Sequence, residues 1–245
     1  MLFRSGKQKF MAASTLSELS ITGMAHPNGL DVNACLVADD WIDHDHPEIV
    51  KKVEELTEGL ETDWEKVRAI FDFTRDEIVY NFAPIIESDN DFKASSVLAG
   101  KNGMCHQKSN LQAALFRAAG IPAALTYQKI VDHPLMNTRY KEMIPDGVLP
   151  YHALAAIHVD GEWYRMEATL DSGLCERRGY RKTELVDEEE SLLPTTKENG
   201  DLHFDIIEDH GYFDSYPQEF LTSMLANKEN WKIWRSFVRK EHLSM

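Results

Sequence analysis

The sequence predicts a fold of mixed helices and strands, in which several helices precede strands that include an antiparallel hairpin. Apolar residues recur at helical spacing in three segments of the first half of the chain, at 47–59, 62–78 and 105–119. Strand-like segments follow at 123–131, 151–159 and 162–168. The last two are joined by Asp160-Gly161, a dipeptide typical of a tight hairpin turn.

Each of the three helices has a start signal in the sequence. Pro47 opens the first, with His46 or Asp45 as its cap. Thr62-Asp63-Trp64-Glu65 is a capping box for the second, because a threonine side chain and a glutamate three positions later satisfy each other's backbone amides. The third begins near Cys105 after a glycine-framed loop and stops before Gly120.

The hairpin register places two polar residues together. If the Asp160-Gly161 turn has two residues, Val159 pairs with Glu162 and the pairing extends back along both strands. His152 and Glu167 then lie on one face as diagonal neighbours, about 7 Å apart at the backbone. That separation allows a hydrogen bond between imidazole and carboxylate.

Cys105 is the candidate nucleophile. Its place in the first turn of a helix exposes the thiol to unpaired backbone N–H groups and to the positive end of the helix dipole. Both favour the thiolate and lower the pKa of the thiol. Cysteine, histidine and a carboxylate form a nucleophile, a base and an orienting group, so the sequence predicts a catalytic set of Cys105, His152 and Glu167.

Several motifs around these residues resemble the transglutaminase-like cysteine enzymes. They are Gly103-Met104-Cys105, the helix end Phe116 to Pro122, Tyr151-His152-Ala153, Trp163 to Thr169, and the upstream segment Phe71 to Ile78. The resemblance covers roughly 43–171. It implies a papain-like α+β core, with the nucleophile helix packed on an antiparallel sheet, and acyl transfer from amides through a thioester. The third catalytic position of that family is usually Asp, whereas this chain has Glu167.

Three neighbours of the nucleophile are weaker candidates for oxyanion or substrate contacts. Gln107 has an amide that can donate a hydrogen bond near the oxyanion, and Asn102 has another. His106 is a possible second imidazole, although a residue directly after the nucleophile points about 100° away on a helix. The backbone N–H of Cys105 is the safer oxyanion donor, and the sequence does not assign the second.

Other polar clusters have structural explanations. The run 43–46, which alternates Asp and His, precedes a helix start, so capping is favoured over metal binding. The acidic run 187–190 lacks the ligand spacing and glycine of a calcium loop, and the basic run 176–182 is expected on the surface. Cys35 and Cys175 have no partner at ligand spacing. We therefore expect no metal and no cofactor.

Composition limits the function classes. A net charge of −15 disfavours nucleic acids and anionic membrane surfaces as partners. The 245 residues include three cysteines, a small and odd number that makes a disulfide framework unlikely and favours a reducing compartment. The first twenty residues lack the apolar stretch of a signal peptide, and no apolar run reaches the roughly 18 residues of a membrane span. These features predict a cytoplasmic protein; its oligomeric state is not indicated.

The sequence suggests three regions, with an N-terminal segment at 1–40 packing on a catalytic core at 41–171. A C-terminal extension at 172–245 is expected in the same domain, with helices at 217–225 and 229–243. The aromatic stripe of the last helix is expected to dock within the molecule, and it can cover the cleft. The predicted activity is hydrolysis of a peptide or other amide. Amine transfer to protein glutamine and a non-catalytic binding module that keeps the fold are the alternatives.

Overall fold

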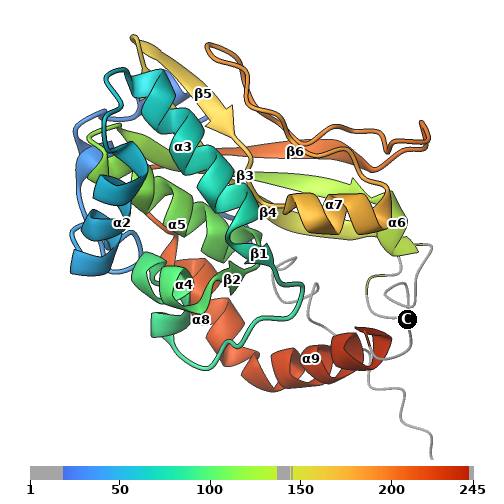
Figure 1. The fold of residues 1–245 in the computed structure, drawn as a ribbon. Coiled ribbons are helices and arrows are strands. Elements are labelled where there is room, and N and C mark those ends of the chain that lie inside the picture. Colours follow the sequence, from blue (N-terminus) through green and yellow to red (C-terminus); the bar gives the residue numbers. More distant parts are fainter. Residues whose placement is uncertain (1–18, 137–143, 145, 243–245) are drawn as a thin grey trace, which may run out of the picture.

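A computed structural model describes residues 19–136, 144 and 146–242, and it is built around a four-stranded antiparallel sheet (Figure 1). The strand order is β5-β4-β3-β6. Two shorter strands, β1 and β2, pair in parallel beside it. The strands are β1 (Val79–Tyr80), β2 (Asn102–Gly103), β3 (Ala123–Asp132), β4 (Val148–Val159), β5 (Glu162–Met166) and β6 (Phe204–Phe213).

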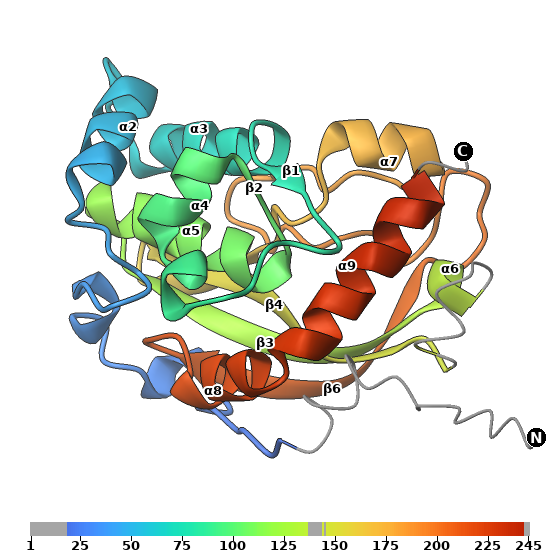
Figure 2. The same ribbon diagram turned by 90° about the horizontal axis from the view of Figure 1, so that it is seen from below.

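Helix α5 packs on β3 and β4, and α2, α3 and α4 contact its other sides (Figure 1). The helix is buried almost all round, because sheet and helices enclose it. Helix α9 runs from α8 toward the end of the molecule that carries α6 and α7 (Figure 2). The helices are α2 (Pro47–Thr57), α3 (Asp63–Asp76), α4 (Ala94–Gly100), α5 (Cys105–Ala118), α6 (His133–Met136), α7 (Ser172–Arg178), α8 (Gln218–Ala226) and α9 (Lys228–His242).

The helix starts predicted from sequence are confirmed. Helix α2 has Pro47 in its first turn, and His46 Nδ1 accepts a hydrogen bond from the backbone N–H of Glu48 at 3.3 Å. The capping box of α3 is complete: Thr62 Oγ1 accepts from the N–H of Glu65 at 3.2 Å, and Glu65 Oε2 accepts from the N–H of Thr62 at 2.8 Å. These local bonds fix where each helix begins.

The hairpin register is confirmed as far as the ladder extends. Val159 pairs with Glu162 and Ala155 with Met166. The turn residues Asp160 and Gly161 have φ values of 53° and 86°, the left-handed conformation that a two-residue hairpin turn requires. The ladder ends at Met166 because the N–H of the next residue, Glu167, donates instead to the carbonyl of Ser191 at 2.8 Å.

The fold deviates from the sequence reading at the ends of elements. Strand β4 begins at Val148, three residues before its predicted start, and β5 ends at Met166, two residues before its predicted end. Helices α8 and α9 match the predicted C-terminal helices within a residue or two. Residues 137–143 and 145, between β3 and β4, lie outside the described residues. Among the described helices, none is both long and apolar enough to cross a membrane.

The described part of the N-terminal segment lies against the sheet. The hydroxyl of Tyr151 donates to the carbonyl of Leu19 at 2.8 Å, and Met24 forms an isolated bridge with Tyr212 of β6. Farther on, the guanidinium of Arg117 donates to the carbonyl of Val37 at 2.5 Å. These contacts tie residues 19–40 to the sheet and to α5, the two elements that carry the site.

Candidate active site

Cys105 is the first residue of α5, and its sulfur is held at the junction of the helix with β2. The preceding residue, Met104, is extended and makes no side-chain cap, so the thiol is next to the amides that begin the helix. Cys105 is partly exposed, whereas Cys35 and Cys175 are buried. A reactive cysteine needs this combination of exposure and nearby N–H donors.

His152 and Glu167 meet as the hairpin register predicts. His152 Nε2 and Glu167 Oε1 are 2.6 Å apart, and both side chains are buried. Because Nε2 faces the carboxylate, Nδ1 is the ring nitrogen left for Cys105, to whose thiol His152 is hydrogen-bonded. The structure thus brings together the three residues that the sequence analysis selected.

Glu167 is itself held in place by two further donors. Its Oε2 accepts from the N–H of Leu193 at 2.9 Å, and its Oε1 accepts from the hydroxyl of Thr169 at 3.2 Å. These bonds fix the longer glutamate side chain at a position where the resembling family usually has aspartate. The extra methylene is accommodated because Glu167 lies just past the end of β5, where the backbone has already turned toward Ser191.

The electrostatics of the three groups favour a charged pair. Burial raises the pKa of the Cys105 thiol, but its hydrogen bond to His152, the charge of that ring and backbone donors outweigh burial, so the net pKa is lowered. Burial lowers the pKa of His152, whereas the charge of Glu167 and the bonds to both partners raise it to about 10. The pKa of Glu167 is also lowered, since His152 outweighs the effect of burial. These shifts favour the thiolate of Cys105 and the imidazolium of His152 over the two neutral groups.

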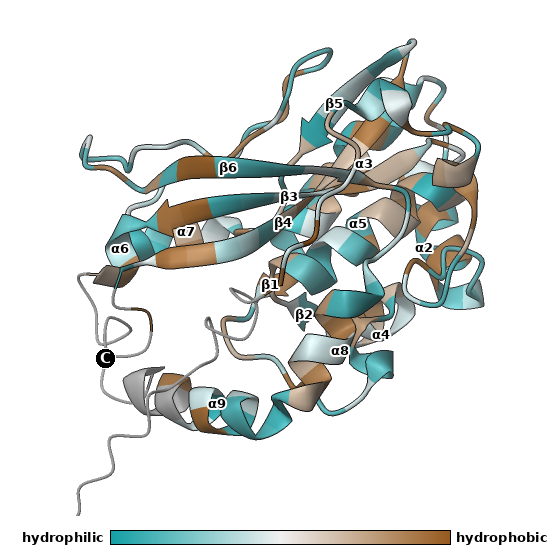
Figure 3. Ribbon diagram, turned by 180° about the vertical axis from the view of Figure 1, so that it is seen from behind, coloured by the Kyte–Doolittle hydropathy of each residue, from teal (hydrophilic) through white to brown (hydrophobic). Residues whose placement is uncertain are grey.

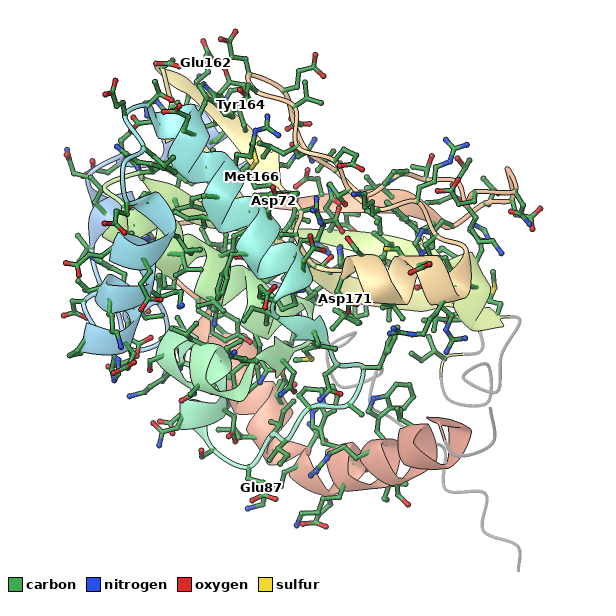
Figure 4. All side chains as sticks on the ribbon, in the orientation of Figure 1. Asp72, Glu87, Glu162, Tyr164, Met166 and Asp171 are labelled. Carbon is green, nitrogen blue, oxygen red and sulfur yellow. The ribbon has the colours of Figure 1, made fainter. Side chains whose placement is uncertain are left out.

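Tyr80 is a site residue that the sequence analysis missed. The parallel pairing of β1 with β2 sets Tyr80 opposite Gly103, two residues before the nucleophile. Its phenol hydrogen-bonds to Cys105, and burial together with the nearby Cys105 raises its pKa well above the ordinary value. Its backbone N–H donates to Asp171 Oδ2 at 2.9 Å; Asp171 lies at the start of α7 (Figure 4). A strand of two residues has no periodicity that a sequence can reveal.

The three weaker candidates have structural partners. Gln107 Oε1 accepts from the N–H of Met104, and its Nε2 donates to the carbonyl of Asp91 at 2.6 Å. Asn102 Nδ2 donates to the carbonyl of Gly100 at 2.6 Å, and its Oδ1 accepts from Asn81 at 2.8 Å. These side chains brace the loop before Cys105, and a contact with substrate stays a prediction for each.

His106 points away from the reactive pair. Its Nε2 bonds to the carbonyl of Tyr151 at 2.8 Å, and its Nδ1 bonds to the hydroxyl of Tyr216 at 3.2 Å. Burial lowers the pKa of His106 to about 4, so the ring is neutral. Both nitrogens are engaged away from the thiol, which leaves the site with one imidazole beside Cys105.

The remaining polar clusters have structural contacts. Asp43 accepts from the N–H and the hydroxyl of Ser95 at the start of α4, and His46 caps α2. The acidic run is paired in part, with Asp187 bonded to Arg68 and Glu190 to Arg165. In the described ranges, no three His, Cys, Asp or Glu side chains gather as metal ligands would.

A largely apolar cleft adjoins the sulfur of Cys105. Its walls come from the sheet, from the segment after β5 and from the C-terminal helices. Trp231 and Trp234 of α9 line it, and the indole N–H of Trp234 donates to the carbonyl of Phe82 at 2.6 Å. The aromatic stripe of α9 therefore docks within the molecule and covers part of the cleft, as the sequence indicated.

Residues 50–168 match the family model of the transglutaminase-like superfamily. The matched region covers just under half of the chain. The match contains Cys105, His152 and Glu167, and it confirms the resemblance stated from the motifs. A comparison of the sequence with curated proteins finds no significant match.

Two solved structures are similar to part of the chain. One is a proposed cysteine protease from Cytophaga hutchinsonii, with 21% identity, a TM-score of 0.45, and coverage of 59% of this chain and 45% of that chain. The other is a proposed protease from Parabacteroides distasonis, with 18% identity, a TM-score of 0.37, and coverage of 57% and 26%. The chain thus spans less than half the length of either protein, and likeness at this level says nothing about its own chemistry.

Proposed function

We propose that this protein is a cysteine hydrolase that cleaves a peptide or another amide through a thioester on Cys105. The observation that carries the proposal is the pairing of a partly exposed thiol with a buried His152–Glu167 couple, in which Nε2 and Oε1 are 2.6 Å apart. A helix-start thiolate with an oriented imidazolium is the arrangement that activates a cysteine for attack on a carbonyl carbon.

The reaction would proceed in two steps. The Cys105 thiolate attacks the carbonyl carbon, His152 gives its proton to the leaving amine, and the carbon–nitrogen bond breaks to leave a thioester. Water then attacks the thioester while His152 takes a proton from it, and the acid leaves as the thiolate is restored. Glu167 keeps the ring oriented and stabilises its positive charge in both steps.

Two hydrogen-bond donors are available for the oxyanion. The first is the backbone N–H of Cys105, at the start of α5. The second is the hydroxyl of Tyr80, which is already within hydrogen-bonding distance of Cys105. A neutral phenol suits this role, since its raised pKa keeps the proton in place until an oxyanion accepts it.

Water is the proposed acceptor because the sulfur is partly exposed and solvent can reach the thioester. The test is incubation with a mixed peptide library, with and without a primary amine such as a lysine analogue, followed by mass analysis. Gain of one water or conversion of amide to acid is the expected product. Predominant amine adducts would replace hydrolysis by transfer. If neither forms and Cys105→Ala leaves binding of a captured peptide unchanged, a binding module would replace the enzyme.

The proposed compartment is the cytoplasm. The mechanism needs a reduced thiol at Cys105, and all three cysteines of the described residues are free. A reducing environment keeps such thiols available for reaction.

A further inference from the structure

Among the described residues, the cleft beside Cys105 is lined by one carboxylate and by mostly apolar walls. The wall residues include Ile130, Leu149, Leu193 and Phe204, and the acidic group is Asp132, at the end of β3. Figure 3 shows the ends of β3, β4 and β6 near α6 in the hydrophobic colour. A carboxylate in such surroundings is costly unless a cation or several donors meet it.

The protein itself satisfies Asp132 only in part. Its Oδ1 accepts from the backbone N–H of Leu135 at 3.2 Å and so caps α6, and within the described residues no other donor reaches the carboxylate. The neighbouring His133 is turned to Asp205, with Nε2 and Oδ2 2.7 Å apart. Burial raises the pKa of Asp132 to about 6, against the smaller opposing effects of the Leu135 amide and the two nearest histidines. A cation from outside the protein would complete this site.

Two more side chains of the cleft each have a nitrogen with no hydrogen-bond partner among the described residues. His203 is 2% exposed and its Nδ1 has no hydrogen bond among the described residues, while its ring stacks on Tyr180 with centroids 4.0 Å apart. Trp231 is 9% exposed and its indole N–H is likewise unpaired there. Burial lowers the pKa of His203 to about 4, and its ring bonds to the carbonyl of Pro194, so Nδ1 is a neutral acceptor. These two side chains offer one acceptor and one donor, the groups that pair with the N–H and C=O of a peptide.

The spacing along β3 relates Asp132 to the nucleophile. Gln128 pairs with His152 across the sheet, and Asp132 lies farther along the same strand. At about 3.3 Å per residue the two strand positions are roughly 13 Å apart. The α-ammonium nitrogen and the carbonyl carbon of the second residue of an extended peptide lie at most about 7 Å apart, at about 3.6 Å per residue. A hydrogen bond of about 3 Å to the carboxylate and a separation of about 3 Å between the sulfur and the carbonyl carbon extend this reach to about 13 Å. A dipeptide therefore matches the separation of the two strand positions.

We propose that the cleft holds the two N-terminal residues of a peptide, with the free α-ammonium at Asp132 and an apolar side chain on the cleft wall. This inference rests on the proposed hydrolase function and narrows it to release of N-terminal dipeptides. Cys105 sulfur bonds to the carbonyl carbon of the second residue, the peptide bond after it breaks, and the proton of His152 passes to the leaving amine. Water then releases the dipeptide as an acid.

The test uses alkylation of Cys105 in the full chain, so it does not depend on turnover. Iodoacetamide labelling is timed with increasing alanyl-phenylalaninamide, or with its N-acetyl derivative, as the competitor. The free dipeptide amide is expected to protect Cys105 at a concentration about tenfold or more below that of the acetylated form, because a charged pair strengthens binding in an apolar cleft. Mass analysis of the same mixture would detect alanyl-phenylalanine, the expected product.

Asp132→Asn is the decisive variant, since asparagine still caps α6 through its oxygen but carries no charge. It should remove the difference between the two competitors and leave protection by the acetylated form unchanged. Asp209→Asn, which alters a carboxylate paired with Arg165 outside the cleft, should keep the difference.

Equal protection by both competitors in the wild type would overturn the ammonium assignment, and protection by neither would overturn the cleft assignment. A different result would contradict the proposed hydrolase function itself. That result is labelling by iodoacetamide, without competitor, that shows no preference for Cys105 over Cys35 and Cys175.

Discussion

Two buried histidines lie near Cys105, and their surroundings give them different charge states, one neutral and one positive. His106 sits among the rings of Tyr127, Tyr216 and Phe220, with centroids 5.4, 5.9 and 5.1 Å away, and its pKa falls to about 4. His152 is 7% exposed, yet its pKa rises to about 10. The first makes neutral hydrogen bonds only, whereas the second faces the carboxylate of Glu167.

The comparison shows that burial alone does not prepare a histidine for catalysis. Burial removes water from both rings and so favours the neutral form of each. A buried, well-hydrogen-bonded carboxylate reverses that preference for His152. His106 is next to the nucleophile in sequence but has no such partner, so adjacency to a cysteine is a poor guide to a catalytic base.

The largest expected effect comes from removing the carboxylate charge of Glu167, which His152 contacts and His106 does not. Glu167→Gln keeps the shape of the side chain but no longer stabilises the imidazolium, so kcat should fall by about 10²-fold or more. Stability should change little, because the amide oxygen can still accept from Leu193. Steady-state kinetics on the substrate found in the library screen measures kcat, and urea unfolding measures the stability. Glu190→Gln removes an exposed carboxylate and should retain activity. Unchanged kcat in Glu167→Gln would mean that another group orients His152.

The length of the same side chain gives a second, smaller effect. Glu167→Asp keeps the charge but withdraws it by one methylene from His152, at a site where two donors fix the glutamate. We expect kcat to fall by about tenfold. Activity at or above the wild-type level in this variant would show that the backbone adapts to the shorter residue.

Tyr80→Phe tests the oxyanion side of the site. The variant keeps the ring but removes the hydroxyl beside Cys105, and kcat should fall by about tenfold with KM nearly unchanged, since the bond strengthens only in the transition state. Loss of the hydroxyl should leave the alkylation preference for Cys105 in place. A rise in kcat would instead identify the Tyr80–Cys105 bond as one that restrains the thiol.

His106→Phe should have the smallest effect on catalysis. Activity per folded molecule is expected within about threefold of wild type, while the unpaired carbonyl of Tyr151 should cost about 1–3 kcal/mol in the free energy of unfolding. Because the pKa of His106 is lower in the folded state, the wild type loses stability as pH falls from about 6.5 to about 4. The variant lacks this pH dependence. The difference in the free energy of unfolding between the wild type and the variant, measured by urea unfolding, should therefore be smaller at pH 5 than at pH 7. Loss of activity without loss of stability would place His106 in catalysis.

The sequence predicted those parts of the site that depend on local rules. A two-residue turn fixes the register of β4 and β5, and extrapolating that register predicted that His152 and Glu167 share a face. Their side chains are in contact at 2.6 Å, although the ladder itself ends at Met166. Helix capping placed the starts of α2 and α3 in the same way. Such predictions succeed because each depends on a few residues that are close in the chain.

Other features depend on packing between distant segments and could not be predicted. Helix α5 carries buried polar residues because elements surround it: Lys108 donates to the carbonyls of Arg75 and Ile78, and Arg117 donates to that of Ala123. Their partners are backbone groups, which leave no trace in residue type. The place of Tyr80 follows from the two-residue pairing of β1 with β2, which has no sequence signature either.

The central claim, that Cys105 is held as a thiolate by His152, is tested most directly by the pH dependence of alkylation. Each cysteine is followed by mass spectrometry of peptides after timed treatment with iodoacetamide between pH 5 and 9. Cys105 should react well before Cys35 and Cys175 at neutral pH, because burial raises the pKa of both other thiols to about 11 whereas that of Cys105 is lowered. Its rate should stay high as the pH falls below 7, and His152→Ala should abolish that persistence. Equal labelling of the three cysteines, or protection of Cys105 until the protein unfolds, would contradict the account.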